Sequence, residues 1–442
     1  MITWFRKKMK VIMLAIVVIF VASMFYGYQS LSGGGSTTQN SNIIGKVNGR
    51  EIDPARFQTI INKIAQTSGG RIGPQDIAFA ENIALGQAID FTLMLGEAEK
   101  KARISGREVD AALDNIMKQQ KIPSKKYLDT LLKNMGLSID KFRNLVKEDM
   151  LVQKFSTNMQ EEIKVTSKDL MEIRASHILV SDESSAKKIQ ADLKAGEDFA
   201  SLAKKYSIDK GTAVKGGDLG YFSTGAMVEP FEDAAFSLKP GEISGIIKTP
   251  FGYHIIKLTD SRMRQFPAGA PPEQIALKEK KDNAFKRWYS ETRSKAKVEV
   301  LMPQLKGHAL RFQGRPADAI TEYKIAAAQN PSNYLIHIYL GDTYMSVGQK
   351  PLAIPEYEMA VRLNGVDPEL YIILGRAYES AGEKGLASQQ FSKASLIAGD
   401  NKALHEKLMK IFSGLKLSRE AANEKSEIAR INKKEAFEKS LK

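Results

Sequence analysis

The chain has 442 residues, of which 43% are hydrophobic and 26% charged, a composition typical of a globular protein with two to four domains. Its net charge is +14, but Lys and Arg alternate with Glu and Asp nearly everywhere, whereas nucleic-acid binders usually cluster their cations on one face. No cysteine is present, which excludes disulfides, thiolate catalysis and a lipid-modified cysteine, and the five histidines never fall at a short metal-ligand spacing. We therefore expect no nucleic-acid partner, no metal and no cofactor.

An apolar segment follows the basic residues 1–10, and residues 11–26 contain only Ser23 as a polar residue. With residues 27 and 28 the segment reaches the roughly 17–25 residues that a membrane-spanning helix needs. A cleaved secretory signal is the alternative, but bulky residues follow the poor cleavage motif at 21–23 (VAS). The basic flank predicts a single-pass anchor at 11–28 in a bacterial cytoplasmic membrane. Residues 1–10 would lie in the cytoplasm, residues 29–42 would form a flexible linker, and the bulk would lie in the periplasm or extracytoplasmic space.

Residues 43–170 carry the apolar spacing of amphipathic helices. An Asn48-Gly49 hairpin turn opens this region, Pro54 stands at the first position of a helix, and Ser105 with Glu108 forms a capping box. No group of polar residues in this region suggests catalysis. We therefore predict a helical domain with a binding role.

Four motifs between residues 171 and 262 predict a small α/β domain with an antiparallel sheet. They are a strand-like segment, a glycine-rich loop, the start of a helix and a final strand, at 175–180 (ASHILV), 216–222 (GGDLGYF), 230–236 (PFEDAAF) and 249–256 (TPFGYHII). In this order they resemble the signature of the parvulin-type peptidyl-prolyl cis/trans isomerases.

The resemblance implies which residues act on a prolyl bond. His177 and His254 match the paired histidines of the family, and Asp209 falls where the family places a group that faces the substrate carbonyl. Thr249 and Ser176 would then hydrogen-bond to the imidazole rings. The expected proline pocket consists of Leu219, Met227, Phe231 and Phe251.

Such a site needs few chemical groups. Rotation about an X–Pro bond is slow because amide resonance must be lost, at a barrier of about 18–20 kcal/mol. A catalyst must bind the twisted amide better than the planar one, which calls for an apolar pocket beside a polar patch. Each residue also has a simpler interpretation: the histidines, Met227 and Phe231 as core residues, and Asp209 as a helix cap. Their occurrence together in the order of the family favours the catalytic interpretation.

The loop at residues 181–185 (SDESS) is acidic, whereas parvulins that act on phosphorylated substrates carry a basic cluster there. Because acidic side chains repel a phosphate group, we predict general X–Pro specificity.

Motifs in and after the helical region resemble the N-terminal chaperone domain of the SurA, PpiD and PrsA group. They lie at 95–98 (LGEA), 105–109 (SGREV), 136–142 (GLSIDKF) and 165–170 (VTSKDL). The resemblance implies a chaperone domain at 43–170, completed by residues 276–300, which follow the isomerase domain (171–262) and a hinge (263–275). An unrelated helical spacer is the alternative.

A period of 34 residues begins after residue 302. Small and aromatic residues recur at this interval in sets of three. The sets are Gly307/Gly341/Gly375, Gly314/Gly348/Gly382, Ala319/Ala353/Ala387, Tyr323/Tyr357/Phe391 and Ala326/Ala360/Ala394. This period predicts three tetratricopeptide (TPR) repeats with a capping helix over 303–415. A charged tail over 416–442 follows, which we expect to be a solvated or frayed helix. The first helices of the repeats would line a peptide groove, with contacts from Leu335, Ile338, Asp342, Met345, Glu369, Ile372, Arg376 and Glu379.

The combined prediction is a multidomain α and α+β protein: a transmembrane helix, a helical chaperone domain, a parvulin α/β domain and a TPR α-solenoid. It would be a membrane-anchored foldase that isomerises prolyl bonds. Its partners would be unfolded or partly folded polypeptides with exposed X–Pro and apolar segments, and a protein or peptide ligand in the TPR groove. Two alternatives are a holdase with an inactive isomerase domain and an assembly scaffold in which isomerisation is incidental.

Overall fold

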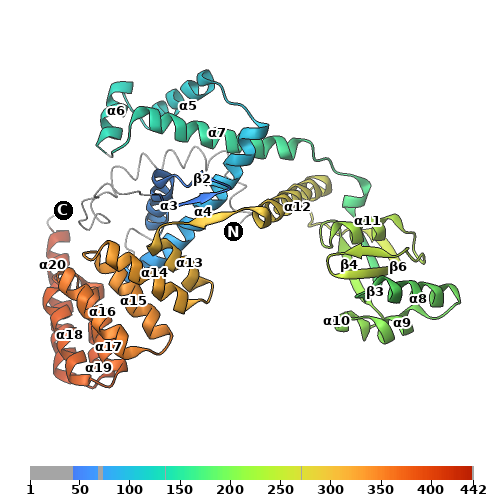
Figure 1. Ribbon diagram of the computed structural model, residues 1–442. Coiled ribbons are helices and arrows are strands. Elements are labelled where there is room, and N and C mark those ends of the chain that lie inside the picture. Colours follow the sequence, from blue (N-terminus) through green and yellow to red (C-terminus); the bar gives the residue numbers. More distant parts are fainter. Residues whose placement is uncertain (1–42, 68–72, 135, 270, 441–442) are drawn as a thin grey trace. The chain divides into compact units, whose positions relative to one another are not determined.

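The structure is a computed structural model that describes residues 43–67, 73–134, 136–269 and 271–440 (Figure 1). The described residues form two compact units, one from residues 43–152 together with 296–440 and the other from residues 153–295. The predicted membrane span at 11–28 lies outside the described residues. Within the described ranges, no helix is long and apolar enough to cross a membrane.

The first unit begins with a three-stranded antiparallel sheet. In it, β1 (Gly45–Val47) pairs with β2 (Arg50–Glu51) on one side and with β7 (Val298–Val300) on the other. The predicted hairpin turn is confirmed, because Asn48 and Gly49 both have positive φ, at 50° and 83°, as a type I′ turn requires. Five helices follow, α3 (Pro54–Thr67), α4 (Pro74–Lys101), α5 (Gly106–Gln119), α6 (Lys125–Lys133) and α7 (Ile139–Glu161).

Two apolar cores hold these helices. One joins α3 and α4 to the sheet, and the other joins α5, α6 and the first half of α7. The capping box is confirmed, since Ser105 Oγ accepts from the Glu108 N–H while the Glu108 carboxylate accepts from the Ser105 N–H. Of the segment 276–300, residues 296–300 complete this unit, through β7 and through hydrogen bonds between Lys297 and Asn48, whereas the helix before them belongs to the second unit.

Four helical hairpins follow β7 in the same unit (Figure 1). They are α13 (Pro303–Phe312) with α14 (Pro316–Gln329), α15 (Tyr334–Ser346) with α16 (Lys350–Leu363), α17 (Pro368–Ser380) with α18 (Lys384–Ile397), and α19 (Lys402–Gly414) with α20 (Ser418–Ser440). A Cβ atom at Gly307, Gly341 or Gly375 would collide with the aromatic ring sixteen residues later. The 34-residue period therefore records a close crossing of two helices inside each repeat.

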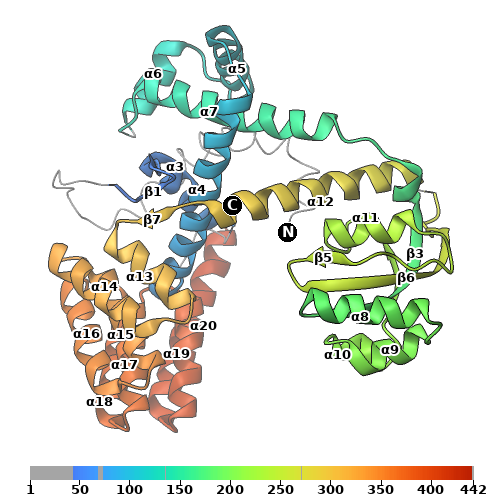
Figure 2. The same ribbon diagram turned by 45° about the vertical axis from the view of Figure 1, so that its right-hand side comes forward.

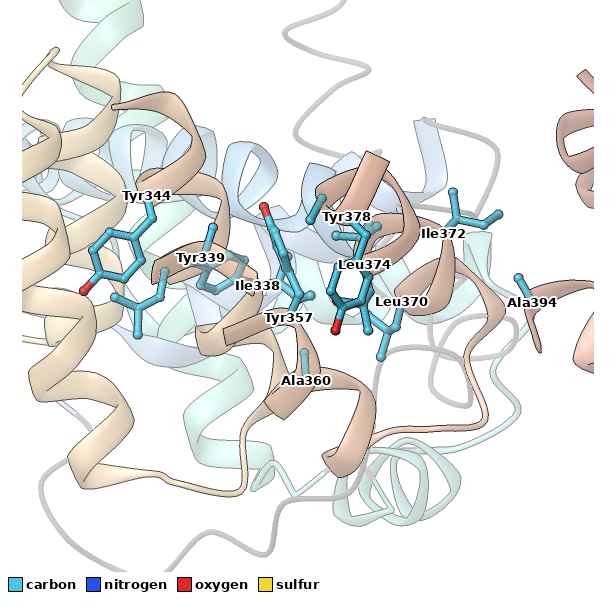
Figure 3. Close-up of a cluster of buried hydrophobic side chains, with 14 of the residues drawn as sticks. Ile338, Tyr339, Tyr344, Tyr357, Ala360, Leu370, Ile372, Leu374, Tyr378 and Ala394 are labelled. Atoms are coloured by element: carbon cyan, nitrogen blue, oxygen red, sulfur yellow. The ribbon is translucent and has the colours of Figure 1, made fainter. Parts of the chain in front are cut away.

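One continuous apolar core runs through the repeats. Figure 3 shows Tyr339 of α15, Tyr357 of α16 and Leu374 of α17 within it. Ile338 and Ile372, which we expected to contact a ligand, are buried in the same core (Figure 3). The prediction is wrong at these two positions. The repeats stack on one another, and both isoleucine side chains are buried in the shared core, where a ligand in a groove cannot reach them.

The charged tail forms a helix with mostly exposed residues, as predicted, but it packs along α19 as the second helix of a fourth hairpin. Glu424 and Ile431 of α20 are each 2% exposed, and α20 lies along α19. Ala421 continues the alanine register, and Lys416 has a left-handed φ of 61° at the position that Gly382 occupies one repeat earlier. The 34-residue period did not predict this hairpin, because Met409 and Lys425 stand where the earlier repeats have the glycine and the aromatic residue.

The first helices of the first two repeats are covered by α4 of the same unit. Glu81 contacts both His308 Nε2 and Gln304 Nε2 through one carboxylate oxygen at 2.7 Å. Gln75 donates to Asp342 over 2.9 Å. Asp342, which we expected to contact a ligand, is therefore engaged within the chain.

The second unit is built on a four-stranded antiparallel sheet of order β4-β3-β6-β5. The strands are β3 (Met171–Val180), β4 (Asp218–Ser223), β5 (Ile247–Thr249) and β6 (Gly252–Met263). Helices α8 (Glu183–Lys194) and α9 (Phe199–Tyr206) cover one face, and α11 (Glu229–Ser237) covers the other (Figure 2). The unit also contains the 3₁₀ helix η1 (Ser167–Leu170), α10 (Lys210–Ala213) and α12 (Pro272–Lys295).

Candidate active site

Alternation along two adjacent strands places both predicted histidines on the face of the sheet that α11 covers. In the β3–β6 register, His177 lies opposite Ile256 and His254 lies opposite Leu179. His177 shares its side of β3 with Ala175, and His254 shares its side of β6 with Ile256, and both of these neighbours belong to the core that α11 completes. Both imidazole rings are buried there.

The glycine-rich loop allows the chain to approach His177 closely. The His177 N–H donates to the Gly217 carbonyl oxygen over 2.9 Å. Gly217 has a φ of 84°, and a Cβ atom on it would collide with the His177 carbonyl oxygen. On the other side of the loop, the Ile208 N–H donates to the Leu179 carbonyl oxygen over 2.8 Å. The segment that carries Asp209 is thus fixed against β3 at both ends.

A chain of hydrogen bonds connects Asp209, His177, His254 and Thr249. His177 Nε2 lies 2.9 Å from Asp209 Oδ2 and 3.1 Å from Thr212 Oγ1. The two Nδ1 atoms of the histidines lie 3.2 Å apart, and the rings are stacked with their centroids at 5.4 Å. His254 Nε2 lies 2.8 Å from Thr249 Oγ1.

The charges of these groups order the protons along the chain. Hydrogen bonds from Thr212 and His177 lower the pKa of Asp209, so its carboxylate accepts and His177 Nε2–H donates. Burial, together with the charge on His177, lowers the pKa of His254 to about 4, so this ring is neutral at pH 7. When His177 carries one proton, on Nε2, its Nδ1 accepts from His254 Nδ1–H. His254 Nε2 then accepts from the Thr249 hydroxyl.

Apolar side chains adjoin this polar chain. Phe231 is 3% exposed, and its ring stands edge-on to His177 and His254 with centroid distances of 5.8 and 5.2 Å. Leu219 and Met227 are half-buried and pack against the same core. Phe251, on the turn between β5 and β6, is 67% exposed. Three of the four predicted pocket residues thus share one core, and the fourth lies on the surface two residues from Thr249.

Sequence reasoning missed Thr212 and assigned a contact to Ser176 instead. Ser176 points to the opposite face of β3 from His177, and among the described residues it is a partner of neither imidazole. Thr212 Oγ1 donates to Asp209 Oδ2 over 2.6 Å. Asp209 also caps α10, since its Oδ1 accepts from the Gly211 N–H over 3.1 Å. The i, i+3 spacing of Asp209 and Thr212 at a helix start is a capping pattern and was the available signal.

The polar chain reaches solvent at one end. The side chain of Asp209 is 30% exposed, whereas His177, His254 and Thr249 are buried. In the described part of the chain, no group of three or more His, Asp or Glu side chains could hold a metal ion. The arrangement therefore offers a partly exposed carboxylate that accepts hydrogen bonds from His177 and Thr212, and the ring of His177 in turn adjoins Phe231.

Family models match three parts of the chain. The PPIC-type PPIase domain matches residues 159–262, the SurA-like N-terminal domain matches residues 1–156, and a tetratricopeptide repeat model matches residues 305–364. The foldase protein PrsA of Geobacillus sp. (strain WCH70) is 36% identical over 252 residues, which cover 55% of this chain and 86% of that protein. The chain belongs to the PrsA foldase family.

Two further PrsA proteins are similar to parts of this chain. The foldase protein PrsA of Bacillus subtilis (strain 168) is 39% identical over 219 residues, covering 47% of this chain and 72% of that protein. The crystal structure of the peptidylprolyl isomerase PrsA from Bacillus anthracis is 33% identical and covers 47% of this chain and 93% of that chain, with a TM-score of 0.28. This PrsA-family chain is a peptidyl-prolyl isomerase with a SurA-like domain and TPR repeats, which confirms the resemblance found in the sequence.

Proposed function

We propose that the isomerase acts through the hydrogen-bonded chain and the apolar wall on the α11 face of the sheet. The catalytic group consists of His177, Asp209, Thr249 and His254, and the substrate-binding group consists of Leu219, Met227, Phe231 and Phe251. The observation that carries this proposal is the position of His177, whose ring stands edge-on to Phe231 while its Nε2 holds the partly exposed carboxylate of Asp209.

The proposed mechanism needs no covalent step. The proline ring enters the apolar pocket, and the carbonyl group before it lies next to the Asp209 carboxylate. Resonance in a planar amide places negative charge on the carbonyl oxygen, and this charge decreases as the amide twists. A nearby carboxylate therefore disfavours the planar amide more than the twisted one, which lowers the barrier. Hydrogen bonds from His177 and Thr212 keep the carboxylate ionised and in place.

The proposed specificity is for X–Pro bonds without a phosphate. The loop between β3 and α8 is acidic, and Asp182 in it caps α8 by accepting from the Ser185 N–H over 2.9 Å. The carboxylate of Asp182 has a lowered pKa, because hydrogen bonds from Ser185 stabilise its charge. A fixed negative charge at this place disfavours a phosphoserine before proline.

The proposed setting of this activity is an extracytoplasmic foldase anchored by residues 11–28. The apolar run with its basic flank supports the anchor, and the SurA-like domain supports a role in binding apolar segments of unfolded clients. In the TPR array, we propose that a peptide ligand binds to first helices beyond those that α4 covers, namely α17 and α19.

A panel of peptides tests the proposed specificity. Ala-Pro, Leu-Pro, Glu-Pro and phosphoserine-Pro peptides are exchanged between cis and trans in the presence of the full chain, and the rates are measured by NMR exchange spectroscopy. We expect acceleration of the first three and little acceleration of the phosphorylated peptide. Preference for the phosphopeptide would contradict the role of the acidic loop. No acceleration of any peptide would leave the chain a holdase.

A further inference from the structure

The loop between β4 and α11 carries Met227, which with Val228 is half-buried against the core of the unit. None of residues 223–230 is fully buried, although Phe222 before the loop and Phe231 after it are. A short loop without fully buried side chains needs directional contacts to keep one conformation. These contacts come from α12.

The first contact runs through a buried carboxylate. Asp169, in η1, is buried, and it accepts hydrogen bonds from Lys280 Nζ of α12 at 2.8 Å and from Thr224 Oγ1 of the loop at 3.1 Å. Thr166 donates to the same carboxylate through its N–H at 2.7 Å and its hydroxyl at 2.8 Å. Lys280 thus supplies the positive charge that a buried carboxylate requires, and Thr224 fastens the loop to this ion pair.

The second contact is between Asn283 of α12 and the backbone of the loop at Gly225. Gly225 has a φ of 87°, and a Cβ atom on it would collide with the amide group of Asn283 of α12. On its other side, the Gly225 N–H donates to Glu232 Oε2 over 2.6 Å. Asn283 therefore closes one side of a turn whose other side is held by α11.

The third contact is at the start of α11, where Arg287 Nη1 lies 3.7 Å from Glu229 Oε2. The three α12 residues, at 280, 283 and 287, are spaced by three and four positions, so they lie on one face of the helix. The contact face is therefore directed at the loop that carries Met227.

We propose that Lys280 and Asn283 are positioning residues of the isomerase: they hold the loop at 224–228, and with it Met227, in the conformation that binds the proline ring. This inference rests on the proposed proline pocket. According to this proposal, α12 contributes to substrate binding, although it follows the region matched by the isomerase family model. The side chains of His177 and Asp209 hydrogen-bond to each other, to Thr212 and to His254, which lie outside α12, so substrate binding should change more than the catalytic step.

The test uses the full chain with Asn283→Ala, Lys280→Met and Lys280→Arg, and with Lys286→Met as a control at an exposed position of the same helix. Steady-state kinetics with an Ala-Pro peptide give KM and kcat, and NMR titration gives Kd for the peptide. We expect Asn283→Ala and Lys280→Met to raise KM and Kd about 5- to 10-fold, with kcat within about twofold, because small displacements of a binding group are costly. Lys280→Arg should restore most of the affinity, and Lys286→Met should equal the wild type.

A double substitution separates positioning from general loss of stability. Gly225→Ala introduces the Cβ atom that meets Asn283, so we expect it to weaken peptide binding less in the Asn283→Ala background than in the wild type. Additive effects, or unchanged KM and Kd in folded Asn283→Ala and Lys280→Met, would overturn the inference. Met227→Ala distinguishes the two proposals. If it weakens binding while the α12 variants do not, only the role of α12 is wrong, and if it has no effect, the proposed pocket itself is wrong.

Discussion

Histidines are buried both in the isomerase unit and in the repeat array, and the two settings differ in what the ring nitrogens contact. In the array, His405 Nδ1 lies 2.6 Å from Glu424 Oε2 of α20, and its Nε2 lies 3.0 Å from the Gly399 carbonyl oxygen. His405 and Glu424 are both buried, so this pair joins three segments and ends inside the core. In the isomerase unit, His177 and His254 contact each other, and their chain ends at Asp209, which is partly exposed.

The difference shows that burial of a histidine does not identify an active site. A pair that is closed on every side, such as His405 and Glu424, can only hold elements together. A hydrogen-bonded chain that starts in the core and ends at a partly exposed group, such as Asp209, can position that group to contact a ligand. Loss of a closed pair should therefore cost stability alone, and loss of a member of the open chain should cost activity.

The largest effect on stability is expected from Glu424→Ala in the closed pair. It leaves His405 buried without its carboxylate, and breaking a buried pair in this way costs about 3–5 kcal/mol. Urea unfolding followed by circular dichroism measures the change, with Glu435→Ala at an exposed position of α20 as the control. The isomerase rate under native conditions should not change. A rate that falls in proportion to the stability would contradict the separation of the two settings.

Phe231→Ala should affect both properties, because Phe231 belongs to the core and to the wall of the site. Removing a buried phenyl ring costs roughly 3–5 kcal/mol. We also expect kcat/KM for an Ala-Pro peptide to fall by more than about tenfold, as a lost apolar contact to substrate is worth 1–3 kcal/mol. Alanine at Phe437, an exposed phenylalanine of α20, should leave stability and rate unchanged and provides the control.

Thr212→Val should have a smaller effect, confined to the open chain. It keeps the shape of the side chain and removes the hydroxyl that donates to Asp209. A hydrogen bond to a carboxylate is worth about 1.5–3 kcal/mol. Because His177 still holds Asp209 in the variant, we expect only part of this to be lost, so that kcat/KM falls about threefold to tenfold with little change in peptide affinity. Thr212→Ser should restore the rate. A rate for Thr212→Val equal to the wild type would show that the hydroxyl does not order the carboxylate.

The smallest effect is a dependence of stability on pH. Burial lowers the pKa of His254 from 6.5 to about 4 in the folded chain. Between these values the unfolded chain binds more protons, so stability rises with pH in this window. The stability of the isomerase unit should therefore be constant above about pH 6.5 and decrease as the pH falls toward 4. Asp209, whose pKa is lowered below its ordinary value of 3.8, loses its contribution only at still lower pH.

Thermal unfolding of the wild type and of His254→Gln between pH 4 and pH 8 tests this dependence. The substitution removes the titrating group, so the difference in melting temperature between pH 7 and pH 4.5 should become smaller. An unchanged difference would assign the pH dependence to other groups.

The sequence predicted the parts of the molecule that depend on local rules or on period. The turn at Asn48-Gly49, the capping box at Ser105 and the helix crossings at Gly307, Gly341 and Gly375 each follow from a short-range steric or hydrogen-bonding requirement. The motifs of the isomerase domain likewise predicted that His177, His254, Asp209 and Phe231 lie together.

Features that depend on contacts between distant segments were not predictable in this way. Three examples are the contact of α4 with Asp342, the contact of Glu424 with His405 that accompanies its burial, and the contact of Asn283 with Gly225. In each case the two partners belong to different elements of the chain. Ser176 was assigned to the wrong face because its register relative to His177 was not weighed. Thr212 lay within reach of local rules and was overlooked.

The most direct test of the proposed site is the rate of cis/trans exchange of an Ala-Pro peptide, measured by NMR exchange spectroscopy with the wild type, Met227→Ala and Met263→Ala. Met227 is half-buried beside Phe231, whereas Met263 is 61% exposed at the end of β6. We predict that Met227→Ala lowers the enzyme-catalysed exchange by about tenfold or more, since a lost apolar contact to the proline ring raises the barrier by 1–3 kcal/mol, and that Met263→Ala equals the wild type. Equal exchange rates for all three folded proteins would contradict the placement of the proline pocket on the α11 face.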